Sequence, residues 1–419
     1  MGELSPSTAC TQRWLSQRRL RFVAMAVLAV NVLLLASALW TWNGRTCVTG
    51  THLGADYAAF YSAGRLLNQY PAGRLYDTEL QAGVYRQLFP GDSDSFLPFA
   101  NAPFVAPVFA LVARLPYTAS YLLWSALSTA LYLGALWLLV CRCSDARHRL
   151  TGLLLGLSFQ PFVVETLHGG QLSALALGLV ALAMELDHRG WRCRAGMVLA
   201  GCWYKPTLLP LLVVMLVVRG RWRTLAGLAA ASALLGGLSL WVVGFDGCAG
   251  YGRLLMRYAQ SSAGAADAFR AWKFIDINSF LKLILGPLST WALTALLLMG
   301  LAMAAWCWRR LSDQRQAWAA AAACVPVLSP YCGIYDAVLA LPAAYVLAAQ
   351  ASKYRWLLVG VYVTPWFSQA LARGAGFQVF TVVLAALAVV ISWRPIHAAY
   401  CICRNSEGNT QEKSGGCPK

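Results

Sequence analysis

The sequence predicts an all-α polytopic membrane protein. Its 419 residues are 59% hydrophobic and only 12% charged, with a mean hydropathy of +0.56, whereas soluble domains carry about 25% charged residues. Segments 150–159 and 379–391 are apolar on every face, which excludes the alternating pattern of an outer-membrane barrel. Because no linker-like or low-complexity run divides the chain, we expect one transmembrane domain over residues 22–395.

Both ends of the chain are expected in the cytoplasm. Residues 1–21 contain four arginines and precede about twenty apolar residues, a run too long for the core of a cleaved signal peptide. We therefore expect an uncleaved first span at 22–42, with residues 1–21 as a cytoplasmic N-terminus and 396–419 as a cytoplasmic tail.

Further spans follow from the apolar segments and the positive-inside rule. They are expected at 118–140, 150–165, 171–187, 224–244, 288–308, 317–330, 336–351, 356–371 and 376–393. Segment 195–218 has arginines beyond both ends and Lys205-Pro206 in its middle. This pattern favours two short helices meeting at the proline over a single span, and brings the total to about twelve membrane helices. The topology puts most of the 34 Lys and Arg residues in the cytoplasm, so the net charge of +17 indicates membrane orientation rather than nucleic-acid binding.

Two outer segments, 43–117 and roughly 245–287, are too long to be simple turns, and structureless loops of that length are usually functional. In the first, apolar and aromatic residues recur at helical spacing, which predicts short amphipathic helices on the periplasmic membrane surface. The residues concerned are Tyr57, Phe60, Tyr61, Gly64 and Leu67, then Leu80, Val84 and Leu88. Residues 102–115 are apolar but too short to span, so we expect them at the outer interface.

Several short motifs follow one another in a recognisable order. They are Asp56-Tyr57 with Phe60-Tyr61-Ser62-Ala63-Gly64-Arg65, Leu75-Tyr76-Asp77, Asn101-Ala102-Pro103-Phe104, Gly169-Gly170-Gln171, Ala195-Gly196 with Lys205-Pro206, Arg219-Gly220-Arg221-Trp222-Arg223, Asn278-Ser279, and Leu328-Ser329-Pro330-Tyr331 ahead of Tyr335-Asp336. In order and spacing they resemble glycosyltransferase family 87 of the GT-C superfamily, over about residues 20–395. No single motif is specific.

The resemblance implies a GT-C-like bundle and a hexosyltransferase. Characterised members of that family are mannosyltransferases that use polyprenyl-phosphate-mannose. The implied reaction moves a sugar, mannose in the family's example, from a polyprenyl-phosphate donor to a lipid-linked or periplasmic glycan. The implied location is the cytoplasmic (inner) membrane, with the active site facing the periplasm. The implied partners are this donor, a glycan or glycolipid acceptor and the lipid bilayer, without nucleic acid.

Asp56 matches the acid in the first loop of the family, and we expect it to act as the general base. Such a base takes the proton of the acceptor hydroxyl and contributes about 10²- to 10⁴-fold to the rate. Phosphate is already a good leaving group, so no second carboxylic acid is required, unlike in glycoside hydrolysis. The alternative is that Asp56 caps a helix, which would favour its ionised form and lower its basicity.

The expected substrate-binding residues surround this acid in the implied topology. They are Tyr57, Tyr61, Arg65, His168, Gln171, Lys205, Asn278, Ser279, Tyr331, Tyr335 and Asp336. Lys205 lies within an apolar stretch, where an ionisable group is costly unless functional; it could reach a headgroup or a buried carboxylate such as Glu165, or snorkel to an interface. His168 and Gln171 flank a glycine turn and could bond sugar hydroxyls or simply be solvated.

Other positions carry open alternatives. Ser279 could bind substrate or cap a helix. Relatives carry histidine near Tyr335-Asp336, so this departure leaves the phosphate-facing role there in doubt. In the second outer segment, Arg253, Arg257, Arg270 and Lys273 could contact phosphate or anionic lipid, or could be solvated charges.

The sequence predicts no cofactor and no metal. It has no P-loop, no Rossmann glycine fingerprint, no nucleophile elbow and no Cys-x-x-Cys zinc spacing. Asp92-Ser93-Asp94 has the form of a metal-binding pair but is typical of a turn. A secondary transporter or flippase for lipid-linked glycans is the alternative function, yet the broken segment 195–218 has no counterpart in the other half of the chain.

Overall fold

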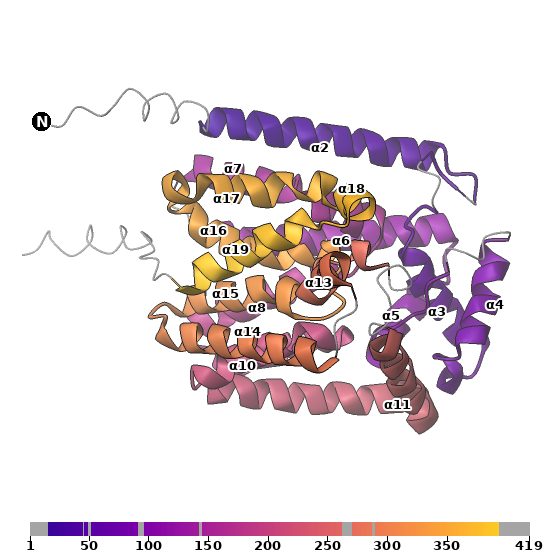
Figure 1. Ribbon diagram of the computed structural model, residues 1–419. Coiled ribbons are helices and arrows are strands. Elements are labelled where there is room, and N and C mark those ends of the chain that lie inside the picture. Colours follow the sequence, from indigo (N-terminus) through magenta and orange to yellow (C-terminus); the bar gives the residue numbers. More distant parts are fainter. Residues whose placement is uncertain are drawn as a thin grey trace, which may run out of the picture.

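The computed structural model describes residues 16–44, 46–48, 52–90, 96–141, 145–261, 270–286 and 290–393. These residues form helices, and the extended pairing among them is an isolated bridge between Phe274 and Gly333. Figure 1 shows a bundle of helices running roughly along one direction, with α3, α4 and α5 gathered at one end. The predicted all-α class is therefore confirmed. The tail at 396–419 and the Asp92-Ser93-Asp94 turn lie outside the described residues.

The bundle contains the long apolar helices and several shorter ones. Its members are α2 (Gln17–Trp40), α6 (Tyr117–Val140), α7 (Ala146–Leu157), α8 (Ser173–His188), α9 (Arg192–Leu199), α10 (Pro210–Val218), α11 (Trp222–Ser261), α14 (Thr290–Arg310), α15 (Gln314–Leu328), α16 (Leu341–Ala348), α17 (Ala351–Val363), α18 (Pro365–Ala375) and α19 (Val379–Trp393). Short segments of other helix types lie between them. They are the π-helix η3 (Pro161–His168) and the 3-10 helices η4 (Ala200–Tyr204), η5 (Pro206–Leu208) and η7 (Ile334–Ala340).

Four of the described helices, α2, α6, α11 and α14, are long and apolar enough to cross a membrane. A fifth span results if α7 and η3, which meet at a 50° bend, are counted together. Shorter apolar helices, such as α19 and the helix at Pro206–Val218, fall below the length test. Several expected spans are broken in the structure; 356–371, for example, is divided where Pro365 begins α18. The chain is a multi-pass membrane protein, and the number twelve stays a prediction.

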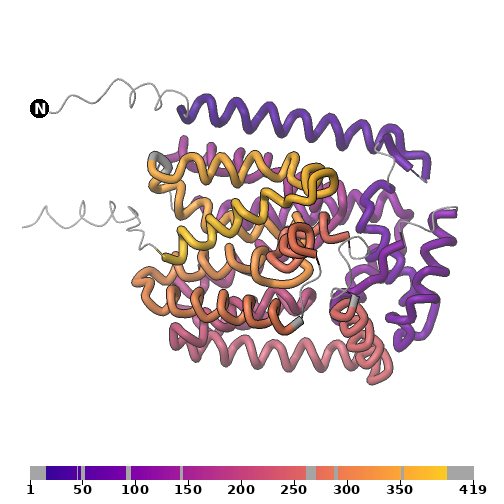
Figure 2. The backbone as a smooth tube through the Cα atoms, viewed as in Figure 1, coloured from indigo at the N-terminus to yellow at the C-terminus, as the bar shows by residue number. Residues whose placement is uncertain are grey.

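The first and last described helices of the bundle share one end; which side of the membrane that end faces stays a prediction. Figure 2 shows that α2 begins and α19 ends at the same end of the bundle, opposite the end where α3, α4 and α5 lie. α2 packs against α7 and leaves much of its apolar surface exposed, as a helix in contact with lipid would. The end of the bundle opposite the start of α2 thus carries a layer of further helices.

The segment around Lys205-Pro206 is broken as the sequence predicts. α9 and η4 end at Tyr204, Lys205 is extended, and η5 begins at Pro206. The start of α9 packs closely on the start of α11: a Cβ added to Gly196 would lie 1.8 Å from the carbonyl oxygen of Thr224. The start of this segment therefore lies next to the start of α11, the helix that follows the segment. The arginines before and after the segment are thus at the same end of the bundle.

The end layer is built from the first outer segment. It contains α3 (Tyr57–Gln69), η1 (Ala72–Arg74), α4 (Thr78–Leu88), η2 (Pro103–Val105) and α5 (Ala106–Val112). α3 is buried along most of its length and packs on α5. A Cβ at Gly64 would lie 2.2 Å from the carbonyl oxygen of Phe109, so glycine permits this close approach. The helices are present where the sequence predicts them; their periplasmic location stays a prediction.

The second outer segment returns to the end layer. α11 bends at Gly244, where φ is 66°, so its second half leaves the bundle axis and packs on η1 and η2. After η6 (Ala271–Lys273), Ile275 donates a backbone hydrogen bond to Cys332, and the amphipathic α13 (Ile277–Leu285) follows. The second outer segment is therefore bonded to the connection between α15 and η7.

Candidate functional site

Asp56 lies where the first outer segment meets the turn between η3 and α8. The backbone amides of Asp56 and Tyr57 both donate to the carbonyl oxygen of Gly169, each at 3.0 Å. These two bonds fix the start of α3 against a turn more than 100 residues further along the chain. The position of Asp56 is thus set by tertiary structure.

The carboxylate of Asp56 is bonded to Gln171. The Gln171 side-chain amide donates to Oδ2 of Asp56 at 2.6 Å. Asp56 precedes α3, but its side chain makes no capping hydrogen bond. Burial raises the pKa of the Asp56 carboxyl above its ordinary value, while the bond from Gln171 and the charge of Lys273 oppose this rise. The carboxylate is therefore not used as a helix cap, and its environment increases its affinity for a proton.

Two aromatic side chains of α6 donate hydrogen bonds to the backbone around the glycine turn that carries Gln171. Tyr121 donates its hydroxyl to the carbonyl oxygen of Leu167 at 2.9 Å, and Trp124 donates its indole N–H to that of Gly170, also at 2.9 Å. Gly170 has φ of 78°, and an added Cβ would lie 2.5 Å from Cβ of Tyr57. Glycine is needed here both for conformation and for space.

Three further polar side chains interact electrostatically with Asp56. Glu165 lies on η3, a π-helix, and Lys273 ends η6 in the second outer segment; Lys273 interacts with both acids. The phenol of Tyr335, on η7, also interacts with Asp56. π-Helical turns are rare and are often found at functional sites. Groups from three separate parts of the chain thus interact with one carboxylate.

Lys205 is paired with Asp336 and not with Glu165. Its ammonium lies 2.5 Å from Oδ2 of Asp336 and 4.8 Å from the centre of the Tyr335 ring. The Asp336 side chain is 1% exposed and also accepts the backbone N–H of Gly333 at 3.0 Å. Of the alternatives for Lys205, contact with a buried carboxylate is confirmed, but the partner is Asp336 and not Glu165, because the turn before η7 brings Asp336 to the ammonium.

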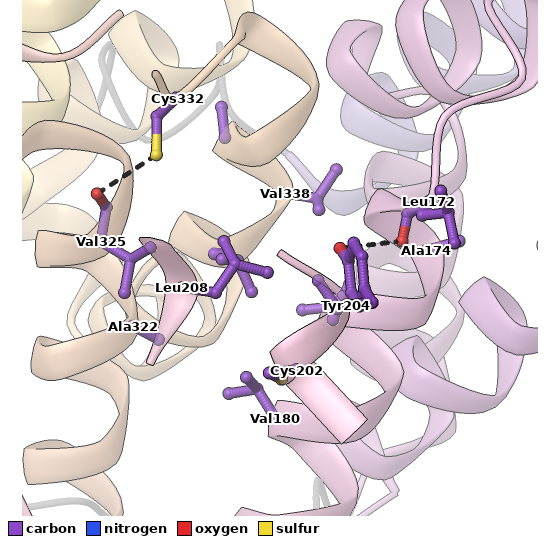
Figure 3. Close-up of a cluster of buried hydrophobic side chains, with 14 of the residues drawn as sticks. Leu172, Ala174, Val180, Cys202, Tyr204, Leu208, Ala322, Val325, Cys332 and Val338 are labelled. Carbon is purple, nitrogen blue, oxygen red and sulfur yellow. Dashed lines mark hydrogen bonds between the residues drawn. The ribbon is translucent and has the colours of Figure 1, made fainter. Parts of the chain in front are cut away.

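The residues beside this ion pair are anchored in the core. Figure 3 shows Tyr204 donating its hydroxyl to the carbonyl oxygen of Leu172 and Cys332 donating its thiol to that of Val325. These bonds are 3.3 Å and 3.6 Å long. The extended Lys205 backbone is therefore held firmly on one side, and the loop before Asp336 on the other.

Three expected contact residues of α3 point elsewhere. The hydroxyl of Tyr57 is 2.5 Å from that of Ser120, and Tyr61 donates to the carbonyl oxygen of Leu115 at 2.9 Å. Arg65 is half-buried more than two helical turns beyond Asp56. His168 is half-buried on η3, where Nε2 has no hydrogen-bond partner among the described residues. None of these side chains bonds Asp56; their role in substrate binding stays a prediction.

The remaining candidates lie around α13 and η7. Asp276 caps α13 and accepts both the backbone N–H and the hydroxyl of Ser279, at 3.0 and 2.9 Å. Burial raises the pKa of Asp276 to about 6, against these hydrogen bonds. Ser279 is therefore not the cap itself but lies in the first turn of α13 and donates to the capping Asp276, and Asn278 beside it is buried. Tyr331 has φ of 60°, a conformation uncommon for a tyrosine.

Sequence reasoning singled out Asp56 and Gln171 but not their contact, and it did not place Glu165 or Lys273 beside the acid. Two features of the sequence could have indicated these neighbours of Asp56. Lys273 is a basic residue in an expected outer segment, and Glu165 is an ionisable residue in an expected span. Among the described residues, no group of three or more His, Cys, Asp or Glu side chains is arranged to hold a metal ion.

These features define a polytopic membrane protein with a buried acid between an end layer and the bundle. The model of glycosyltransferase family 87 matches residues 99–330, more than half of the chain. The chain therefore belongs to glycosyltransferase family 87 and is a membrane glycosyltransferase. No curated protein and no solved structure gave a match. The matched residues include Gln171, Glu165 and Lys205, whereas Asp56 and Tyr335 lie outside them.

Replacement of Gly170 by alanine tests the geometry of the turn. The new Cβ would collide with Tyr57 and would sit at a positive φ, so the turn, Gln171 and Asp56 must shift. A misplacement of 1 Å can lower a rate on the order of 10²-fold, and we expect a loss of sugar transfer of about that size. The measurement is the initial rate of transfer by purified protein.

Gly83→Ala is the matched control, because a Cβ at Gly83 meets nothing within 4 Å. It should keep the wild-type rate. Equal rates for both alanine variants would show that the turn does not position the acid.

Proposed function

We propose that this glycosyltransferase moves a mannosyl residue from a polyprenyl-phosphate donor to a hydroxyl of a lipid-linked or periplasmic glycan at the outer face of the cytoplasmic membrane. Asp56 acts as the general base. The observation that supports this most directly is the buried carboxylate of Asp56, bonded to Gln171 and free of any capping role. A base poised in this way suits removal of a proton from a hydroxyl near neutral pH.

The surrounding groups have complementary tasks in this proposal. Gln171 orients the carboxylate through its 2.6 Å bond. Lys273 supplies positive charge beside Asp56, where the donor phosphate leaves. Glu165 adds a second carboxyl group that interacts with both Asp56 and Lys273. Tyr335, lying over Lys205, offers a phenol and a flat face to a sugar ring.

The proton and the bonds balance in the proposed step. The acceptor oxygen attacks the anomeric carbon, its proton passes to Asp56, and the bond from that carbon to the phosphate oxygen breaks. The polyprenyl phosphate leaves with the electron pair. Such a donor carries its sugar in water and its tail in lipid, which requires a membrane enzyme with a site at the interface.

The donor class can be tested with purified protein in lipid vesicles. Radiolabelled polyprenyl-phosphate-mannose and a radiolabelled nucleotide mannose are each incubated with a total membrane-lipid and glycan extract. We expect label in a new glycosidic product from the lipid-linked donor. Transfer from the nucleotide sugar alone would contradict the proposal, as would accumulation of label inside sealed vesicles without a new bond.

The pH dependence of the rate should report the raised pKa of Asp56. A base must be deprotonated, so the rate should rise with pH and level off above the pKa of Asp56 in the folded protein. Because burial raises that pKa, the inflection should lie above the value of about 3.9 for an ordinary aspartate. The measurement is kcat/KM against pH. A flat profile across the carboxylate range would argue against a carboxylate base.

A further inference from the structure

A cavity of about 440 Å³ lies between the end layer and the second half of α11, away from Asp56. Its walls come from the turn at η1, the start of α4 and one face of α11. The lining residues that matter here are Arg74, Glu79, Asp246, Arg253 and Arg257. They combine cationic and anionic groups in a cavity that the proposed transfer step does not use.

The fold builds this cavity through glycines. The break at Gly244 turns α11 toward η1. A Cβ on Gly250 would lie 3.3 Å from Cβ of Tyr76, so the helix can approach closely there. Tyr76, which lines the cavity, packs against Tyr251 with ring centres 5.1 Å apart. The arginine-bearing face of α11 is thereby held against the end layer.

Two arginines of the cavity have no carboxylate within ion-pair distance. Arg74 forms an ion pair with Asp77 at 2.6 Å, but among the described residues Arg253 and Arg257 form no ion pair. They are exposed and lie one helical turn apart, and an anion bound between them would relieve the repulsion of these like charges. Over the whole lining, the three arginines are matched by Asp77, Glu79 and Asp246. Arginine pairs of this kind match the geometry of phosphate. Asp246 and Glu79 can accept hydrogen bonds from hydroxyl groups.

The length of α3 places the η1 wall of the cavity far from Asp56 and argues against the donor phosphate as the occupant. α3 has 13 residues and separates Asp56 from η1, which amounts to about 20 Å at 1.5 Å per residue. The donor phosphate must instead lie within one sugar ring of the base. A ligand in this cavity is therefore a different molecule, or the far end of the acceptor.

We propose that this cavity binds a phosphate ester and the sugar hydroxyls next to it at the distal end of the acceptor glycan. This inference rests on the proposed function, since it assigns the acceptor to a place some 20 Å from the base. Arg253 and Arg257 hold the phosphate, and Asp246 and Glu79 accept hydrogen bonds from hydroxyls.

The proposal is tested by titrating the full-length protein in detergent with mannose 6-phosphate, inorganic phosphate and mannose, using calorimetry. Wild type should bind mannose 6-phosphate more tightly than either fragment. The double variant R253Q/R257Q should bind it on the order of 10- to 100-fold more weakly, because two charge-assisted contacts are lost. The matched control R86Q/R114Q, which removes two exposed arginines of the first outer segment, should bind like wild type.

Two further arms locate the ligand and identify its source. Mannose 6-phosphate should slow hydrogen exchange in residues 246–257 of wild type and of Asp56→Asn alike, so binding is scored independently of catalysis. Equal affinity of wild type and R253Q/R257Q would overturn the proposal. Competition by vesicles of phosphatidylglycerol, which lack sugar, would overturn it as well and assign the cavity to a lipid headgroup.

Discussion

Replacing Asp56 with asparagine is expected to lower the rate of sugar transfer by about 10²- to 10⁴-fold, the contribution of a positioned general base. Asparagine keeps the shape of the side chain and an oxygen that can accept the Gln171 amide. It cannot take up a proton from the acceptor. The measurement is the initial rate with a saturating polyprenyl-phosphate sugar, so that a change in kcat is separated from one in KM.

The same variant should not be less stable than wild type. Burial raises the pKa of Asp56, so this group stabilises the folded state most below its unfolded pKa, and that contribution is lost as pH rises through the folded pKa. Above the folded pKa the buried carboxyl must be ionised, and asparagine removes that cost. An unfolding midpoint equal to or above that of wild type, together with lost transfer, separates catalysis from structure.

Asp145→Asn is the matched control. Asp145 is an exposed aspartate that caps α7, and asparagine is an equally good cap. Both its rate and its unfolding midpoint should stay at the wild-type values. Undiminished transfer by Asp56→Asn would show that Asp56 is not the base.

Breaking the ion pair between Lys205 and Asp336 is expected to have the largest effect on stability. Asp336 is buried, and its ammonium partner is 2.5 Å away. Lys205→Met would leave an uncompensated charge in the interior, which costs about 3–5 kcal/mol. The measurement is the free energy of unfolding in mixed detergent micelles, followed by tryptophan fluorescence.

The double variant Lys205→Met with Asp336→Leu should be more stable than the single Lys205→Met, because no buried charge remains. Arg74→Met serves as the control, since it breaks a pair of similar length at the surface; exposed pairs contribute about 1 kcal/mol or less. A double variant less stable than Lys205→Met alone would contradict this explanation.

Local features of the fold could be predicted from the sequence. The helices at 57–69 and 78–88 follow from helical spacing of apolar residues, and the break at Lys205 follows from the proline after it. The number of spans could not be predicted in the same way. Several apolar runs are divided by bends that tertiary packing sets, as at Pro365.

The contacts of the site could not be predicted, because they join distant parts of the chain. Gln171 is 115 residues from Asp56, and Asp336 is 131 residues from Lys205. A sequence shows that a buried lysine needs a partner but does not select Asp336 over Glu165. The family resemblance identified Asp56 as the acid. The structure was needed to show that its side chain makes no capping hydrogen bond.

The orientation of Asp56 is tested most directly by labelling single cysteines with a membrane-impermeant maleimide in intact cells. The 13 native cysteines are first replaced by serine or alanine in a variant that still transfers sugar. Gln87→Cys, on α4 in the end layer, should be labelled from outside, and Arg223→Cys, near the start of α11, should be labelled after permeabilisation alone. The reverse pattern would place Asp56 on the cytoplasmic face and contradict transfer from a donor on the outer side.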